Sequence, residues 1–257
     1  MSAQMSTATD IAELASIAAV AGGLATAGYF VEGLRPTSSL FGRCLVAPHN
    51  PDEIALTFDD GPNPRWTPQL LDLLAKYNVR ATFFLIGQFA VKQRELVRRT
   101  HEAGHLIGNH TWTHPNLFRT DPATTRKELD VTTNRLQQIT GTRVRFFRPP
   151  YGFRRPRTLR IARDLGMIPV TWNVIGNDWN APSAEAIVSR VTRLTEKNRS
   201  RGDATNLVLH DGGHLTLDAD RSRTVAATEE LLKRYTATRR FVTLDEWESY
   251  AVSYLNG

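Results

Sequence analysis

Two short segments carry side chains that could do chemistry together. A TFDDGP segment places two adjacent carboxylates, Asp59 and Asp60, at the end of an apolar run. An HTWTH segment places two imidazoles, His110 and His114, four residues apart after another apolar run. Two histidines and one aspartate can hold a divalent metal ion and leave one coordination position open for water. The other aspartate is then free to act as a base, and this combination suggests hydrolysis by metal-activated water.

Each of these patterns also has an ordinary structural interpretation. Asp-Asp-Gly-Pro is good turn chemistry, and histidines at i and i+4 face one ion only if the segment makes a helical turn. An H-E-x-x-H sequence from His101 to His105 matches the signature of zinc metalloproteases, which requires both histidines on one continuous helix. Gly104 and the apolar run after it indicate that the helix ends there. We therefore interpret this match as a helix C-terminus, where a histidine interacts favourably with the helix dipole.

Three more segments carry polar side chains that could act in such a site. An RPPYG segment begins at Arg148, and its two prolines could hold a neighbouring N–H in place. Arg148 itself could pair with a carboxylate and keep it ionised. His210 ends an apolar run and could serve as an acid, and Asp178 and Trp179 follow a further run. His214 lies later in the loop after His210, and a surface role is the simpler interpretation of that residue.

The elements that must position these side chains alternate along the chain. Short apolar runs predict strands at residues 54–58, 81–86, 106–109, 144–147, 168–172, 206–210 and 241–243. Longer amphipathic segments predict helices at residues 67–77, 88–103, 122–139, 156–165, 184–197 and 219–235, with a short last one at 244–252. Strands that alternate with helices predict parallel pairing through right-handed crossovers.

The candidate side chains share one position relative to these strands. Each of them lies at or beyond the C-terminal end of a predicted strand. A closed parallel barrel gathers those strand ends on one face, which is where the active sites of such barrels lie. Polar residues distributed at random would not line up in this way. The sequence therefore predicts an α/β barrel with its site on that face.

Composition sets further bounds on the class of protein. A chain of 257 residues suffices for one large α/β barrel or two small domains. Residues 32–52 are rich in Gly, Pro, Ser and Asn and predict a linker, and residues 53–252 show no further boundary. The single cysteine, Cys44, excludes an internal disulfide and a cysteine-based zinc cluster. The net charge of +6 comes from scattered arginines without an RNA-binding signature, so a nucleic-acid partner is not expected.

The N-terminal segment, residues 1–31, contains an almost wholly apolar or small run from 14 to 31. As a helix, that run would be about 27 Å long, which is marginal for spanning a bilayer. Ala25-Thr26-Ala27 resembles a signal-peptidase site, but no Lys or Arg precedes the run, unlike a normal signal peptide. A membrane anchor, a cleaved signal and a docked helix all stay open. The charge bias would place the C-terminal side in the cytoplasm if the run is an anchor.

Taken together, the motifs resemble those of the NodB-homology polysaccharide deacetylase family, also called carbohydrate esterase family four, over about residues 52–250. The family motifs TFDD, H-[ST]-x-x-H and R-x-P-Y occur here in the family order. The L-x-H motif is matched at Val208-Leu209-His210, with Val in place of Leu. The D-x-x-D-W motif is partial, because Ile175 stands in place of its first Asp, a carboxylate that helps to orient or tune the acid histidine.

The resemblance implies a fold, a metal and a set of roles. The implied fold is a distorted barrel of seven or eight β/α units. The implied cofactor is a divalent metal, usually zinc, although such a ligand set also accepts cobalt or manganese. The implied ligands are Asp60, His110 and His114. The implied catalytic residues are Asp59 as base, Arg148 as its charge partner, Tyr151 as a backbone oxyanion donor and His210 as acid.

The resemblance also implies a substrate and a place of work. The expected substrate is an acetylated glycan, peptidoglycan or a chitin-like polymer, whose N-acetylglucosamine-type sugars would give acetate and a free amine. We expect Trp179, Tyr151 and Asp178 to bind it. Two alternatives stay open: an O-acetyl esterase acting on xylan-like polymers, and an inactive envelope protein that binds glycan. The expected location is the bacterial cell envelope, with residues 14–31 as a membrane anchor or an export signal; the oligomeric state is left open.

Overall fold

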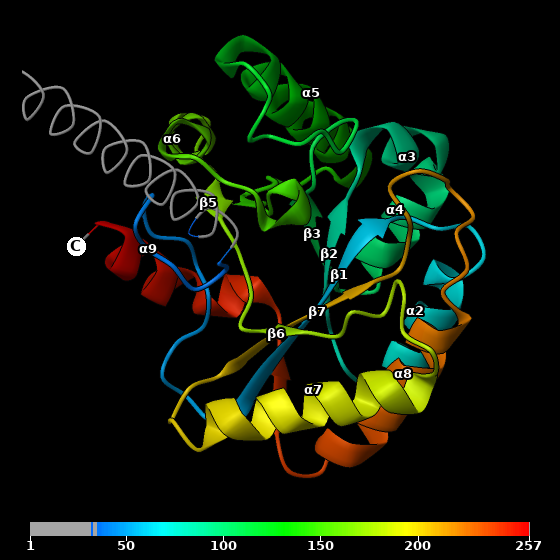
Figure 1. Cartoon of the computed structure of the whole chain (residues 1–257). Coiled ribbons are helices and arrows are strands. Elements are labelled where there is room, and N and C mark those ends of the chain that lie inside the picture. The colour runs from blue at the N-terminus through cyan, green and yellow to red at the C-terminus, as the bar shows by residue number, and fades with distance from the viewer. Residues whose placement is uncertain (1–31, 33–34, 257) are drawn as a thin grey trace, which may run out of the picture.

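The computed structural model describes residues 32 and 35–256 of the chain, and a curled parallel sheet forms the centre of this part (Figure 1). Its strands are β1 (Glu53–Gly61), β2 (Thr82–Leu85), β3 (Leu106–Asn109), β4 (Phe146–Phe147), β5 (Ile168–Pro169), β6 (Val174–Ile175), β7 (Thr205–His210) and β8 (Arg240–Val242). Their order is β5-β4-β3-β2-β1-β7-β6, and β8 also pairs with β1. Every pair is parallel, which confirms the predicted α/β class.

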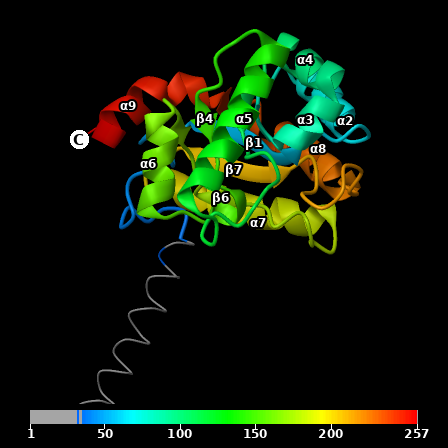
Figure 2. The same ribbon diagram turned by 90° about the horizontal axis from the view of Figure 1, so that it is seen from above.

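The helices cover the outside of this sheet (Figures 1 and 2). They are α2 (Thr67–Lys76), α3 (Gly87–Lys92), α4 (Arg94–Glu102), α5 (Pro122–Thr140), α6 (Pro156–Asp164), α7 (Ala184–Arg199), α8 (Ser222–Tyr235) and α9 (Glu248–Asn256), with 3-10 turns η1 (Pro150–Gly152) and η2 (Leu244–Trp247). Helices α7 and α8 pack together near β6 and β7, whereas α3, α4 and α6 pack around α5. Within the described residues, no strand pairing joins β5 to β6, so the curled sheet stays open there.

β1 runs through the middle of the molecule, and all nine of its residues are buried. Its first half pairs with β8 and its second half with β2 on one side, while β7 pairs along the other side. Phe58 stacks on Phe83 of the neighbouring strand with ring centroids 5.1 Å apart. A strand buried on both faces and held on both edges is a rigid support for the two carboxylates near its end.

Helix boundaries follow local chemistry. Asp121 accepts hydrogen bonds from the N–H groups of Ala123 and Thr124 at the start of α5, and Gly141 ends the helix in the left-handed conformation with φ 71°. The single helix predicted over 88–103 is wrong, because the chain breaks at Gln93 into α3 and α4. Helix α8 begins at Ser222, three residues later than predicted.

The H-E-x-x-H segment does not form the geometry of a zinc protease. His101 lies in α4, which ends at Glu102, and Gly104 follows with φ 83°. His105 is therefore outside the helix, where its Nδ1 accepts a hydrogen bond from the N–H of Ala81 at 3.1 Å. Burial lowers the pKa of His105 to about 4, so the ring is neutral and structural. The interpretation of this segment as a helix C-terminus is confirmed.

Two strand predictions need correction. The strand predicted over 168–172 stops at Pro169, and β6 was not predicted at all. Just beyond β5, the carbonyl of Thr171 accepts hydrogen bonds from the side chains of Asn206 and Arg148 instead of continuing a ladder with its neighbours. β6 has only two residues, too few for a period of two to be recognised.

The segment predicted as a linker takes part in this packing near its end. Leu45 is fully buried and pairs with Val170. Its N–H donates to the carbonyl oxygen of Pro169 at 2.8 Å, and its carbonyl oxygen accepts from the N–H of Thr171 at 3.0 Å. Cys44 beside it is buried as a small filler. The division of the chain at residues 31 and 52 stays a prediction.

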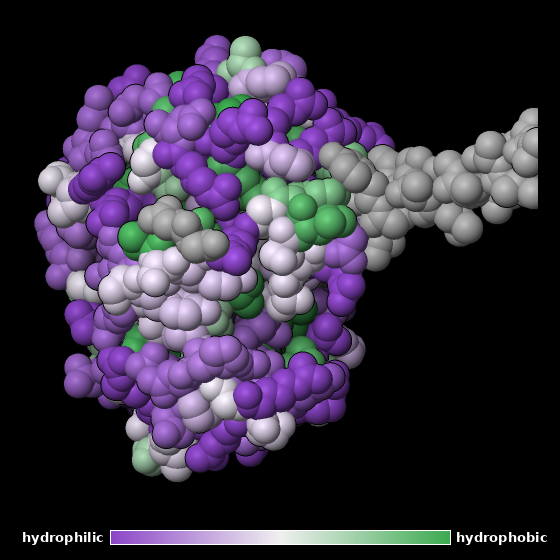
Figure 3. Space-filling model, turned by 90° about the vertical axis from the view of Figure 1, so that its left-hand side faces the viewer, coloured by the Kyte–Doolittle hydropathy of each residue, from purple (hydrophilic) through white to green (hydrophobic). Residues whose placement is uncertain are grey.

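The side of the molecule that carries α6 and α9 is mainly hydrophilic, with small separate hydrophobic areas (Figure 3). None of the helices in residues 35–256 combines the length and apolar character that a bilayer crossing needs. The predicted anchor or signal at residues 14–31 lies outside the described residues.

The ends of β1 and β7 approach each other so closely that Gly61 has no space for a side chain. A Cβ atom at this position would lie 2.2–2.6 Å from the carboxyl atoms of Asp211. We expect Gly61→Ala to lower the free energy of unfolding, measured in urea, by about 3 kcal/mol, because overpacking in a tight core costs this much. Gly202→Ala is the control: it has open space and φ 78°, so only about 1 kcal/mol of backbone strain is expected. Equal losses in the two variants would contradict the packing argument.

Candidate active site

A cavity of about 320 Å³ opens at the C-terminal ends of the strands, where the sequence placed the site. Its wall contains residues that lie in or just after β1, β3, β6 and β7, together with Tyr151 from η1. The lining residues are Asp59, Asp60, His110, His114, Tyr151, Trp172, Ile175, Trp179, Val208, His210, His214 and Arg221. Segments that are far apart in the sequence therefore meet in one pocket, as expected for parallel strands that share a face.

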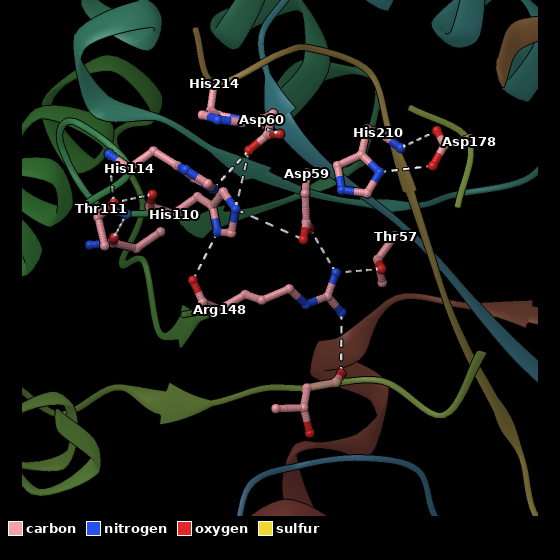
Figure 4. A network of polar contacts seen from close by, with 12 residues as sticks. Thr57, Asp59, Asp60, His110, Thr111, His114, Arg148, Asp178, His210 and His214 are labelled. Atoms are coloured by element: carbon pink, nitrogen blue, oxygen red, sulfur yellow. Dashed lines mark hydrogen bonds and ion pairs between the residues drawn. The ribbon is translucent and has the colours of Figure 1, made fainter. Parts of the chain in front are cut away.

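Three buried side chains on one side of the cavity form a potential metal site (Figure 4). Asp60 Oδ1 lies 3.4 Å from Nε2 of His110 and 3.2 Å from Nε2 of His114, and the three potential ligand atoms all lie within 4.8 Å of one another. Asp60 Oδ1 has no hydrogen-bond donor among the described residues although it is fully buried. A divalent cation would satisfy this oxygen, so the residues present fit the metal that the sequence implied.

The orientation of His110 and the pKa of His114 suit metal binding. His110 Nδ1 donates to the carbonyl oxygen of Arg148 at 2.8 Å, and this hydrogen bond orients the ring with Nε2 toward Asp60. Burial, helped by the neighbouring His110, lowers the pKa of His114 to about 3. A neutral imidazole is the form that binds a cation. The His114 ring is thus in the form that binds a metal at neutral pH.

The two histidines meet without the helical turn that their spacing suggested. Thr111 and His114 both have positive φ, 67° and 58°, and the segment between β3 and α5 contains no helix. Glu128 on α5 holds the segment, because its carboxylate accepts from the N–H groups of Trp112 and Thr113, each at 2.8 Å. Sequence reasoning missed Glu128, since nothing in its own segment indicates a contact with residues 112 and 113.

Asp59 lies beside the metal site but is held by a different partner. Its Oδ1 accepts a hydrogen bond from Arg148 Nη1 at 2.7 Å, and its Oδ2 lies 3.9 Å from His110 Nε2. Arg148 is fully buried, and its guanidinium also donates to Thr57 Oγ1 at 2.7 Å and to Asn206 Oδ1 at 3.2 Å. Adjacent aspartates therefore have different environments, one facing two imidazoles and the other paired with a buried cation.

His210 lies on the opposite side of Asp59, at the end of β7 (Figure 4). Its Nδ1 is 2.8 Å from Asp178 Oδ1, and its backbone N–H donates to Asp178 Oδ2 at 2.8 Å. Thr224 Oγ1 donates to the same Oδ2 at 2.7 Å. Burial opposes the charge on the imidazole, but the charge and hydrogen bond of Asp178 outweigh it and raise the pKa of His210 to about 9. His210 is thus protonated at neutral pH, with Nε2 on the free side of the ring.

Comparison with known proteins decides the family. The family model for polysaccharide deacetylase matches residues 47–170. A peptidoglycan-N-acetylglucosamine deacetylase of Bacillus cereus is 37% identical over 205 residues, which cover 79% of this chain and 71% of that protein. The chain belongs to the polysaccharide deacetylase family.

Two further comparisons agree with this family. A chitooligosaccharide deacetylase of a Bradyrhizobium species is 38% identical over 160 residues, covering 62% of this chain and 70% of that protein. The crystal structure of the Bc1960 peptidoglycan N-acetylglucosamine deacetylase superposes with a TM-score of 0.68 at 34% identity, covering 79% of this chain and 91% of that one. The fold predicted from the strand pattern is thereby confirmed.

For a member of this family, the role predicted for Asp178 needs correction. We expected Asp178 to bind substrate, but it is buried, and both carboxylate oxygens are occupied by His210 and Thr224. Asp178 therefore lies behind His210, outside the cavity lining. Ile175, which replaces the first aspartate of the family motif, lines the cavity wall. His210 still has a carboxylate partner, because Asp178 pairs with it.

Trp179 and Tyr151, the other residues predicted to bind substrate, line the cavity, as does His214, which was not predicted. Trp179 is 47% exposed and packs edge-on against His210, with ring centroids 5.0 Å apart. Tyr151 is also exposed and meets the edge of His114 at 4.5 Å. His214 stacks on His114 at 4.6 Å, and its Nδ1 lies 3.9 Å from Asp60 Oδ2. Its place four residues after His210, in a glycine-rich loop at a strand end, was the signal that could have identified it.

The Asp178–His210 pair can be tested without any substrate. We expect Asp178→Asn to lower the pKa of His210 from about 9 toward its ordinary value of about 6.5, because burial then opposes only the smaller effects of Asp60 and Asp59. The imidazolium would lose its proton between pH 6 and 9, a range in which the unaltered protein keeps it. NMR titration of labelled histidine measures this pKa, with the solvent-facing His49 as an internal reference. An unchanged pKa would show that Asp178 does not set the charge of His210.

Proposed function

We propose that this chain is a metal-dependent deacetylase that hydrolyses the N-acetyl group of N-acetylglucosamine-type sugars in peptidoglycan or chitin-like glycans. The products would be acetate and a free amine. The observation that carries the proposal is the arrangement of one cavity: a potential metal site, a separate carboxylate and a protonated histidine within it. The relatives named for peptidoglycan and chitooligosaccharide deacetylation support the same reaction.

Asp60, His110 and His114 would hold the metal ion, and we propose zinc because two imidazoles and a carboxylate suit it. A bound divalent ion supplies an activated water and a Lewis acid for the acyl carbonyl. Asp59 would accept the proton from the attacking water, and its pairing with Arg148 orients the carboxylate for this role. Arg148 also fixes the carboxylate in place, because its guanidinium is held by other buried partners.

The remaining steps fall to residues on the other walls of the cavity. The backbone N–H of Tyr151, a residue of the cavity wall, would donate to the acyl oxygen as negative charge develops there. His210 would then give its Nε2 proton to the departing amine nitrogen. Its pKa of about 9 makes it an acid at neutral pH. Trp179 would provide an apolar wall for the acetyl group or the sugar ring.

A substrate panel tests the proposal and separates it from its alternatives. The purified full chain, loaded with zinc, is incubated with peptidoglycan, chitooligosaccharides and acetylxylan, and acetate is measured together with new amino groups. We expect acetate and amine in equal amounts from the first two. Acetate from acetylxylan alone would indicate an O-acetyl esterase, and glycan binding without any acetate would indicate an inactive envelope protein.

The proposal extends to the arrangement of the chain and its location. We propose that residues 53–252 form the catalytic domain, reached through residues 32–52 from an N-terminal anchor or export signal at 1–31. A location at the bacterial cell envelope is supported by the peptidoglycan-directed relatives. Protease protection of intact cells and membrane fractionation test this part, and complete release of the protein by high salt would contradict an anchor.

A further inference from the structure

The segment that enters the domain from the N-terminal side is bonded to the loop that carries Tyr151. Arg154, 1% exposed, lies just after η1. Its Nη2 donates to the carbonyl oxygens of Arg35 and of Ser38, the latter at 2.9 Å. Its Nη1 donates to the carbonyl oxygen of Gly152 at 3.3 Å. One buried guanidinium thus joins residues 35–38 to the η1 loop.

A second bond ties the same segment to the other side of the site. Thr171 Oγ1 donates to the carbonyl oxygen of Pro36 at 2.6 Å. The carbonyl of Thr171 itself accepts from Asn206 Nδ2 at 2.9 Å and from Arg148 Nη2 at 3.4 Å. Residues 35–38 therefore contact both the Tyr151 loop and the network that holds Arg148 against Asp59.

The Tyr151 loop needs such support, because its backbone is strained. Tyr151 has φ 58°, a left-handed conformation that costs a non-glycine residue about 1–2 kcal/mol. Gly152 follows with φ 70° and packs against Trp172, so closely that a Cβ would lie 2.8 Å from the indole ring. Such a conformation persists only where the surroundings impose it. Arg154 donates a hydrogen bond to the carbonyl of Gly152, so its side chain can hold this backbone conformation in place.

We propose that residues 35–38 are a structural part of the active site, and that Arg154 is a positioning residue that holds the Tyr151 N–H where the oxyanion forms. This inference rests on the oxyanion role proposed above for Tyr151. The family match begins at residue 47, so it assigns no role to residues 35–38. The chain entering from the apolar N-terminal run is thus fixed beside the catalytic cavity and is not a free tether.

The test compares two adjacent arginines in the full, zinc-loaded chain. Arg154→Met removes the bonds to residues 35–38, whereas Arg155→Met removes a guanidinium stacked on Phe118 at 3.9 Å. We expect Arg154→Met to lower kcat on a chitooligosaccharide about tenfold or more, because a donor displaced by 1 Å can cost about 100-fold. KM and zinc affinity should stay unchanged, since these hydrogen bonds of Arg154 go to the carbonyl oxygens of residues 35, 38 and 152. Arg155→Met keeps kcat within twofold.

Two more variants separate positioning from folding. Arg154→Lys keeps the charge and is expected to recover part of kcat. If Arg154→Met does not fold, Thr171→Val gives the same comparison, because it removes the bond to Pro36 and keeps the carbonyl that Arg148 uses. A kcat within twofold of the unaltered protein in the folded variants, or an equal loss in Arg155→Met, would overturn this inference alone. No acetate release by the unaltered protein would overturn the proposed function and this inference with it.

Discussion

Asp59→Asn is expected to reduce kcat for acetate release by about 10²–10⁴-fold, the usual contribution of a general base. The asparagine has nearly the same shape but cannot take a proton from water. The change spares the potential metal ligands, because Asp59 Oδ1 faces Arg148 and Asp60 faces the two imidazoles. Zinc content by elemental analysis and kcat on a chitooligosaccharide measure the two effects on one preparation.

The control for Asp59→Asn addresses its effect on stability. Loss of the carboxylate charge leaves Arg148 buried without a counter-ion, which can cost about 3–5 kcal/mol. Thermal unfolding must therefore show that the variant is folded at the assay temperature. Asp72→Asn is a matched change in an exposed pair with Arg99, and it should leave kcat unchanged. An Asp59→Asn variant with more than a tenth of the original kcat would exclude Asp59 as the base.

His110→Ala is expected to weaken zinc binding by more than about 100-fold and to bring acetate release to background. Loss of a group that merely orients a ligand costs about 10–100-fold in metal affinity, so loss of a ligand should cost more. Isothermal titration of the chelator-treated protein with zinc measures the affinity without any substrate. Readdition of zinc should restore the activity of the chelated unaltered protein and not that of the variant.

His101→Ala is the control for His110→Ala. His101 belongs to the H-E-x-x-H segment but lies on α4, away from the cavity lining. Its replacement should leave the zinc affinity and acetate release unchanged. If His101→Ala lost zinc and His110→Ala kept it, the H-E-x-x-H segment would be the zinc site. The proposed reaction would then have no basis.

The sequence could predict that the candidate residues lie at strand ends, but not the direction in which each side chain points. The alternating apolar runs predicted the parallel sheet, and side chains at the ends of β1, β3 and β7 meet because parallel strands end on one face. The pattern could not show that Asp178 turns away from the cavity toward His210. Direction depends on the backbone after β6, a strand of two residues with no readable period.

Contacts that depend on backbone atoms left no signal in the sequence. Arg154 binds carbonyl groups more than 100 residues away, and every residue has such a group. The same holds for Glu128, whose partners are backbone N–H groups of the His110–His114 segment. The break at Gln93 between α3 and α4 likewise lacks a glycine or proline to announce it. In each case tertiary packing, and not local propensity, decides the structure.

Anomalous diffraction from crystals grown with zinc tests most directly whether Asp60, His110 and His114 bind one ion. We expect one strong peak about 2.0–2.2 Å from an oxygen of Asp60 and from Nε2 of His110 and of His114. The carboxylate of Asp59 should remain paired with Arg148, outside the coordination sphere. A peak at His101 and His105, or no peak at Asp60 in a crystal whose protein releases acetate, would contradict it.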